Sequence, residues 1–300
     1  MKKILIVLIF VLIISIFIGP AGIKKEIILN LRLPRILMGF FVGASLSLSG
    51  LSLQGVFKNP LLEPYLIGIS SGGALFSFIS YLIPFDFILK TPLFSFFGSI
   101  FSVTLILLIS RFAKYNPYSI LLLGISISIL FSSILAFLIY LLPSERIQIF
   151  FYLFGGLSRS SWLKLFIVFL SFIFSFIFLL IKNKELDIIL LKEEEAFSLG
   201  VNPEKFYIEI IFFSSILAST SVAFNGIIGF IGLIVPHISR ILIGEKHINL
   251  IPFSSILGGI VLVLCDDLSR ILIKGIEIPV GIITSFIGVP FFLYLLFKKL

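Results

Sequence analysis

The stretch "LRLPRILMGFFVGASLSLSGLSLQGVFKNPLLEPYLIGISSGGA", residues 31–74, decides the fold class. After Arg32 and Arg35 no charged residue follows until Lys58, and an apolar run of this length can cross a membrane as one helix. The break "FKNPLLEP" favours a turn at Asn59-Pro60, because the residue before a proline avoids the α conformation. A second apolar run follows directly. The pattern predicts two membrane helices joined by a short turn.

The composition excludes an ordinary soluble domain. Of 300 residues, 59% are hydrophobic and only 13% are charged, with a mean hydropathy of +1.23. Soluble domains are about 45–50% apolar and about 25% charged. The net charge of +8 is typical of lysines and arginines that flank spans, and no basic patch with interleaved aromatics indicates nucleic acid. We predict an all-α polytopic membrane protein surrounded by lipid.

The number of spans follows from charge and turn signals. Nine uncharged apolar runs occur, but Lys2-Lys3 and Lys298-Lys299 both prefer the cytoplasm, so an even number is favoured. The run from Ile210 is too long for one crossing and contains a turn signal at Asn225-Gly226. We interpret the N-terminal run as a span and not as a signal peptide. About ten transmembrane helices are therefore predicted, at 4–23, 36–57, 65–85, 91–110, 118–142, 165–181, 203–224, 229–243, 248–265 and 278–297.

Two local patterns refine these helices. Asn202 followed by Pro203 is typical of a helix start, with Asn202 as the cap. Gly39, Gly43 and Ser47 recur every fourth residue, which lets a neighbouring helix approach closely.

The longest polar stretch, residues 182–205, divides the chain into halves of about 1–160 and 161–300. Each half would hold five helices, so the two halves would be inverted in the membrane. "SGLSLQG" (49–55) aligns with "TSVAFNG" (220–226), and a break follows each. Inverted repeats are typical of transporters, whose path lies at the repeat interface. The candidate pathway or hinge residues are Gln54, Asn59, Pro60, Asn225 and Gly226.

Motifs along nearly the whole chain resemble one family. They are "LRLPR", "NPLLEPYLIGISSGGA", "FYLFGGLSRSSW", "EEEAFSLGV", "GIIGFIGLIVPHISRILIG", "LCDDLSR" and "EIPVGIITSFIGVPFFLYLL". The sequence resembles the FecCD-type (type II) ABC importer permeases for iron-siderophores, haem and vitamin B12. The resemblance implies ten helices per subunit, two permease subunits, two ABC ATPase subunits and an extracytoplasmic substrate-binding protein. It departs at "NGIIGF", where Ile227 replaces the usual proline of the family.

Arg32, Arg35 and Arg270 are candidates for docking the binding protein. Arginine binds a carboxylate with two parallel hydrogen bonds, and the family's matching arginines meet acidic residues on the two lobes of that protein. The alternative is interfacial arginines that snorkel at the membrane surface. Pro34 is expected to start the helix. Asp266 and Asp267 stand at helical-neighbour spacing from Arg270, which favours a local ion pair at a membrane edge that water reaches.

The segment 182–205 is either a solvated loop or a pair of short coupling helices that lie in a groove of the ATPase. The resemblance favours coupling and assigns it to Leu191, Glu195, Ala196, Leu199 and Gly200. No P-loop occurs in the chain, so ATP and Mg²⁺ would bind only to the partner ATPases. No catalytic residue, metal site or bound cofactor is predicted, and the two histidines stand alone.

The predicted function is the permease subunit of a binding-protein-dependent ABC importer in the cytoplasmic membrane, as a homodimer with both termini inside. The alternative is an ion-coupled secondary transporter that uses Asp266 and Asp267. The substrate stays open among ferric siderophores, haem, cobalamin and metal oxyanions.

Overall fold

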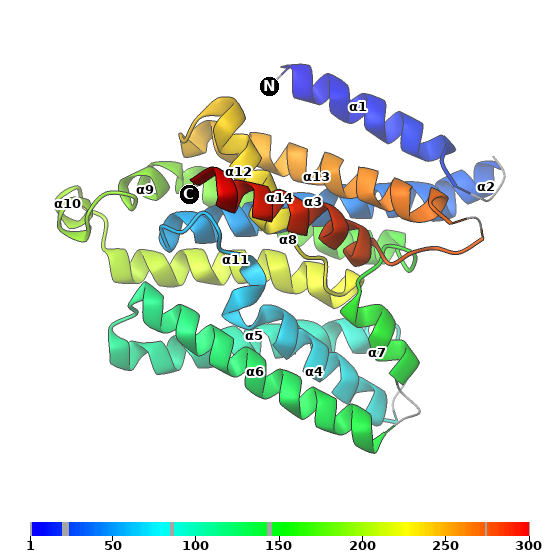
Figure 1. Cartoon of the computed structure of the whole chain (residues 1–300), viewed down its shortest axis with the longest axis horizontal. Coiled ribbons are helices and arrows are strands. Elements are labelled where there is room, and N and C mark those ends of the chain that lie inside the picture. Colours follow the sequence, from blue (N-terminus) through cyan, green and yellow to red (C-terminus); the bar gives the residue numbers. More distant parts are fainter. Residues whose placement is uncertain (1, 20–23, 85–86, 143–145, 274, 300) are drawn as a thin grey trace.

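The computed structural model describes residues 2–19, 24–84, 87–142, 146–273 and 275–299, and within these ranges the chain is helical throughout its regular elements. Figure 1 shows the helices, most of which run along one common direction. They are α1 (Lys2–Phe17), α2 (Lys25–Ile27), η1 (Ile28–Arg32), α3 (Leu33–Val56), η2 (Pro64–Ile67), α4 (Ile69–Leu82), α5 (Lys90–Ser110), η3 (Arg111–Ala113), α6 (Pro117–Leu141), α7 (Arg146–Leu153), α8 (Trp162–Ile181), α9 (Asn183–Ile188), α10 (Glu193–Ser198), α11 (Pro203–Asn225), α12 (Ile231–Ile243), α13 (His247–Ile271) and α14 (Val280–Lys299).

The membrane character predicted from composition is visible in these helices. Six helical segments of the described residues are long and apolar enough to cross a membrane. Four shorter apolar helices lie at the remaining predicted positions: Lys3–Phe17, Ile69–Leu82, Ile231–Ile243 and Val280–Tyr294. Helices this short do not by themselves match a hydrocarbon core of about 30 Å. The all-α membrane architecture is thus established, while the number of ten spans stays a prediction. Residues 20–23 and 85, included in two predicted spans, lie outside the described residues.

Helix α3 is the centre of the bundle. In its most apolar window 83% of residues are buried, against 28% for α6 and α8, which leaves those two helices at the periphery. The small residues of α3 explain its position. A side chain on Gly43 would collide with the backbone of Gly258 in α13, and one on Gly50 with the backbone of Gly232 in α12. The predicted close approach along the Gly39–Ser47 stripe is therefore confirmed.

Hydroxyl groups hold the neighbouring helices at this short distance. Ser47 Oγ donates to the carbonyl of Ser254 in α13 at 2.8 Å. Ser49 Oγ donates to the carbonyl of Ser214 in α11 at 2.8 Å, and the hydroxyls of Ser52 and Ser214 lie 2.7 Å apart. Backbone contact between helices and serine hydrogen bonds are the means by which helices associate in lipid.

The predicted break between two helices near Asn225-Gly226 is confirmed. Helix α11 ends at Asn225, Gly226 has a positive φ of 72°, and α12 begins at Ile231. The start of α11 also matches its prediction, because the Asn202 side chain accepts a hydrogen bond from the backbone of Lys205 at 3.2 Å. Both features are local and depend on side-chain chemistry that the sequence displays directly.

The expectation that Pro34 starts its helix is wrong. Helical structure begins at Lys25 and runs through the π-helical turn η1, Ile28–Arg32, into α3. Proline has no backbone N–H to donate and its ring clashes with the preceding turn. The wider π turn accommodates Pro34 inside a continuous helix.

The two ends of the bundle carry different elements. Figure 1 shows α2 and α7 on one side and α9 and α10 on the opposite side. Helix α1 runs towards the α2 side, and α14 runs back towards the side of α9 and α10. We refer below to the α2 end and the α10 end.

Candidate functional site

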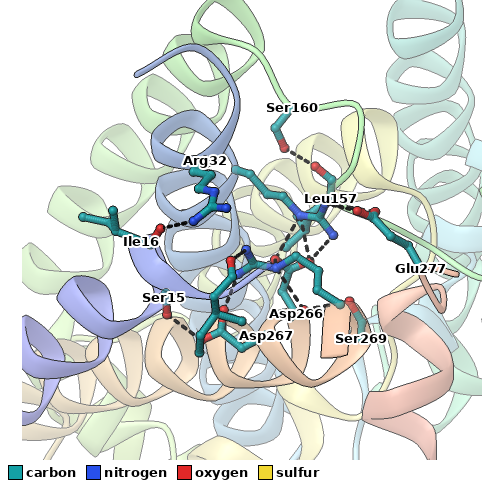
Figure 2. A network of polar contacts seen from close by, with 12 residues as sticks. Ser15, Ile16, Arg32, Leu157, Ser160, Asp266, Asp267, Ser269 and Glu277 are labelled. Atoms are coloured by element: carbon teal, nitrogen blue, oxygen red, sulfur yellow. Dashed lines mark hydrogen bonds and ion pairs between the residues drawn. The ribbon is translucent and has the colours of Figure 1, made fainter. Parts of the chain in front are cut away.

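The three predicted docking arginines lie together at the α2 end. Arg32 and Arg35 stand where η1 passes into α3, and Arg270 stands in the last turn of α13. Figure 2 shows Arg32 next to Ile16 at the end of α1, with Asp266, Asp267 and Glu277 in the same polar network. We call this set, with Ser15, the arginine network.

Arg35 is bound by two acids. Its Nε and Nη2 atoms donate to the Asp266 carboxylate at 2.9–3.1 Å, and its Nη1 donates to both Glu277 oxygens at 2.9 and 3.1 Å. Asp266 is therefore held by two nitrogens of the guanidinium, the geometry that gives arginine its strongest bond with an acid, while Glu277 is held by Nη1 alone.

Arg270 continues the network towards α1. It forms ion pairs with Asp267 and with Asp266, the latter at 3.2 Å, and Nη1 donates to the carbonyl of Ile18 at 2.7 Å. Ser15 Oγ donates to Asp267 at 2.5 Å. The local ion pair predicted from the spacing of the aspartates is confirmed. Charges alternate in the order Glu277, Arg35, Asp266, Arg270, Asp267.

Arg32 is also bound by α1 and does not project into solvent. Its Nη1 donates to the carbonyl of Ile16 at 2.5 Å, and the residue is 5% exposed. With three arginines and three acids, the formal charges of the network add to zero. The end of α1 thus covers two of the three arginines, Arg32 and Arg270.

The expected exposure of the two aspartates is wrong. Asp266 is 2% exposed and Asp267 is 4% exposed, because α1, α3 and α13 enclose them. Asp266 pairs with Arg35 and Arg270, and Asp267 pairs with Arg270. This pairing also speaks against the ion-coupled alternative, which needs an acid that is free to bind and release a cation.

The coupling segment forms two short helices, as predicted. Helix α9 is anchored: Leu186 is fully buried, and Asp187 Oδ1 accepts from the backbone N–H of His247 at 3.1 Å and lies 2.6 Å from its Nδ1. The Lys58 ammonium donates to the carbonyl of Leu191. These contacts connect α9 to the end of α3 and the start of α13.

Helix α10 projects from the bundle and exposes apolar side chains. Phe197 is 67% exposed and Leu199 is 59% exposed, while Leu191 and Glu195 are also exposed. Ala196 is buried and faces the protein. Gly200 ends the helix with a φ of 85°, a conformation that favours glycine. Figure 1 shows α10 at the extreme edge of the molecule. Exposed large apolar groups at such a tip indicate a contact surface.

Three predicted pathway residues, Gln54, Asn59 and Pro60, lie at the α10 end of α3. Gln54 Nε2 donates to the carbonyls of Leu62 and Gly232, at 3.2 and 3.1 Å, while its Oε1 accepts from Arg240 at 2.6 Å. Asn59 Oδ1 caps the turn by accepting from the backbone of Leu61 at 3.0 Å. Gln54 therefore connects α3 to α12, and Asn59 with Pro60 shapes the turn between α3 and η2.

The other two candidates, Asn225 and Gly226, lie near α7. The Asn225 carbonyl accepts from the backbone of Gly156 at 2.8 Å, and a side chain on Gly226 would collide with the carbonyl of Tyr152. Asn225 and Gly226 border a cavity of about 440 Å³, which Arg35 and Glu277 also line. Gln54 and Asn225, the carboxamide residues of the two aligned segments, thus lie at different ends of the bundle.

Glu63 and Tyr65 hold the break before α12 and were not predicted as site residues. Glu63 Oε1 accepts from the backbone N–H of Phe230 at 2.6 Å, and Tyr65 Oη donates to the carbonyl of Ile228 at 3.1 Å. Burial raises the pKa of the Glu63 carboxyl, and the hydrogen bond from Phe230 opposes that rise. In the sequence Glu63 and Tyr65 flank Pro64 in the break "FKNPLLEP", whose pattern indicates only a turn.

Glu277 and Asp187 were also missed. Each has a partner that is remote in sequence: Arg35 is 242 residues from Glu277, and His247 is 60 residues from Asp187. Spacing rules within one helix do not reach such pairs.

Together, these features define a polytopic helical transport subunit: a close-packed bundle with a polar network at one end and an exposed apolar tip at the other. The profile of the FecCD transport family matches residues 4–298.

Curated relatives cover most of the chain. The hemin transport system permease protein HmuU of Yersinia pestis is 37% identical over 277 residues, which are 90% of this chain and 83% of that protein. The molybdate import system permease protein MolB of Haemophilus influenzae is 37% identical over 282 residues, covering 92% and 82%. The cobalamin import system permease protein BtuC of Halobacterium salinarum is 35% identical over 279 residues, covering 93% and 75%.

A solved structure agrees with the whole bundle. An inward-facing metal-chelate type ABC transporter matches with a TM-score of 0.92 and 33% identity, over 99% of this chain and 98% of that one. This chain belongs to the FecCD transport family. It is the transmembrane permease subunit of an ABC importer, a transport component and not an enzyme. Such a system includes ATPase and binding-protein partners.

Proposed function

We propose that two copies of this chain form the path of an importer for a metal-containing chelate or oxyanion. The observation that carries this proposal is similarity over nine-tenths of the chain to permeases named for hemin, molybdate and cobalamin. ATP and Mg²⁺ would bind the two partner ATPases, whose hydrolysis shifts the permease between inward- and outward-facing states.

The test is transport by the assembled importer. The chain is purified with its ATPase subunits, reconstituted in vesicles, and supplied with its binding protein and hemin, ferric siderophore, cobalamin or molybdate. We expect ATP-dependent uptake of one of these substrates. Uptake that needs an ion gradient and no ATPase would overturn the proposal in favour of secondary transport.

We further propose that the α2 end faces the extracytoplasmic side and docks the binding protein through Arg32, Arg35 and Arg270. The α10 end then faces the cytoplasm, together with both termini. Support comes from the common location of the three arginines and from the opposite location of α10. Cysteines introduced at positions 26 and 199 should react from opposite sides of the membrane, and labelling from one side would refute this orientation.

Coupling would use the α10 surface. Its exposed members Leu191, Phe197 and Leu199 suit an apolar groove, since a short helix binds such a groove through its apolar face. Ala196 would support the helix from below, while Glu195 and Gly200 border it. The division into inverted halves of about 1–160 and 161–300 belongs to the same proposal, with Gln54, Asn59, Pro60, Asn225 and Gly226 at hinges of the moving helices.

A further inference from the structure

Arg35 is held by two carboxylates that differ in how easily they can leave. The Asp266 side chain is 3% exposed and stands inside α13. The Glu277 side chain is 43% exposed and stands on the connection between α13 and α14. Displacing Asp266 would require helices to separate, whereas displacing Glu277 requires only rotation of a surface side chain.

The geometry of Arg35 keeps these two bonds separate. Nε and Nη2 bind Asp266, while Nη1 binds Glu277. Loss of Glu277 would therefore open one edge of the guanidinium without disturbing the bond that fixes its position. Nη1 could then donate to an incoming carboxylate as it does to Glu277.

Arg270 and Arg32 are bound by buried acids and by backbone carbonyl groups. Arg270 binds Asp266 and Asp267, whose side chains are 3% and 6% exposed. Arg32 donates to the carbonyl of Ile16, a backbone group that cannot rotate away. Among the acids of the arginine network, Glu277 is the accessible one.

We propose that Glu277 occupies the position of a carboxylate of the binding protein and is exchanged for it on docking. This inference rests on the proposed docking at the α2 end. It adds the step that makes Arg35 available to the binding protein, namely its release from Glu277. One ion pair replaces another, so docking gains little energy at Arg35 and stays reversible. Glu277 also lines the 440 Å³ cavity, so its release changes the rim of that cavity when the partner arrives.

The experiment measures binding-protein affinity for the permease–ATPase complex in nanodiscs at low and high salt. Glu277→Gln removes the competing charge but keeps the size of the side chain. We expect about threefold to fivefold tighter docking at low salt, or about 0.7–1 kcal/mol, and a smaller gain at high salt. Glu26→Gln is the matched control, since Glu26 is an exposed acid at the same end, whereas Arg35 binds Asp266 and Glu277.

A second background separates this inference from the docking surface itself. Arg35→Gln/Asp266→Asn removes the arginine without leaving an unpaired buried charge. In that background Glu277→Gln should behave like Glu26→Gln. If Glu277→Gln equals the control in the wild-type background while the double variant docks weakly, the exchange is wrong and the docking surface stands. If the double variant docks as tightly as wild type, the docking surface itself is wrong.

Discussion

Asp266 is expected to be the most important single charge for the stability of the α2 end. Its carboxylate binds Arg35 at 2.9–3.1 Å and Arg270 at 3.2 Å, and all three side chains are at most 14% exposed. Asp266→Asn preserves the shape and removes the charge. Arg35 would then keep only Glu277, and Arg270 only Asp267.

The size of the effect follows from burial. Breaking a buried ion pair by removing one partner costs about 3–5 kcal/mol. Each arginine retains one acid, so we expect the lower end, about 3 kcal/mol. A matched control is Glu209→Gln, which removes one ion pair with Lys182 at 3.3 Å between side chains that are 28% and 27% exposed. Such a pair contributes about 1 kcal/mol at most.

The assay is equilibrium unfolding of the purified chain in mixed micelles, followed by helicity and by the fluorescence of its single tryptophan, Trp162. Arg35→Gln/Asp266→Asn should cost less than the sum of the two single variants, because it leaves no buried charge without a partner. Coupling of about 0.5–3 kcal/mol is expected for residues in one network. If Asp266→Asn costs no more than Glu209→Gln, the stabilising role assigned to the alternating charges is refuted.

Three further outcomes are expected. Gly43→Ala should weaken the bundle in the same unfolding assay, because its methyl group meets a backbone carbonyl of α13, whereas Gly156→Ala has free space and should be neutral. Phe197→Glu should abolish binding-protein stimulation of the partner ATPase but spare folding, and Phe112→Glu, another exposed phenylalanine, should not. Glu63→Gln should become more stable than wild type as pH rises, because the pKa of Glu63 is raised in the folded protein and its ionisation is therefore destabilising. Below the ordinary glutamate pKa of about 4.3, variant and wild type should have the same free energy of unfolding. A difference that is independent of pH would contradict this assignment.

The features predicted correctly are those that depend on residues close together in the sequence. The cap at Asn202, the break after Asn225 and the pairing of Arg270 with its neighbouring aspartates each depend on a few positions of one segment. Apolar run length likewise located the long helices, because the lipid core imposes one length on every span.

The arginine network was predictable only in part, because several of its ion-pair partners are far apart in the sequence. Arg35 and Asp266 are separated by 231 residues, and no spacing rule joins them. The sequence therefore presented Arg35 as an unpaired docking residue, whereas the fold pairs it with two acids from the other half of the chain. Pro34 misled for a different reason: a proline indicates a helix start only when no π turn precedes it.

Helix α3 connects the two ends physically. It begins beside Arg35, in the arginine network, and ends with Gln54 bound to α12 and Gly55 near His247 of the α9 contact. Its 24 residues extend roughly 36 Å, more than the hydrocarbon thickness of about 30 Å. Backbone contacts at Gly43 and Gly50 leave α13 and α12 no room to slide independently. Helix α3 therefore joins the arginine network to the contact between α9 and His247, and it packs backbone to backbone against both α12 and α13.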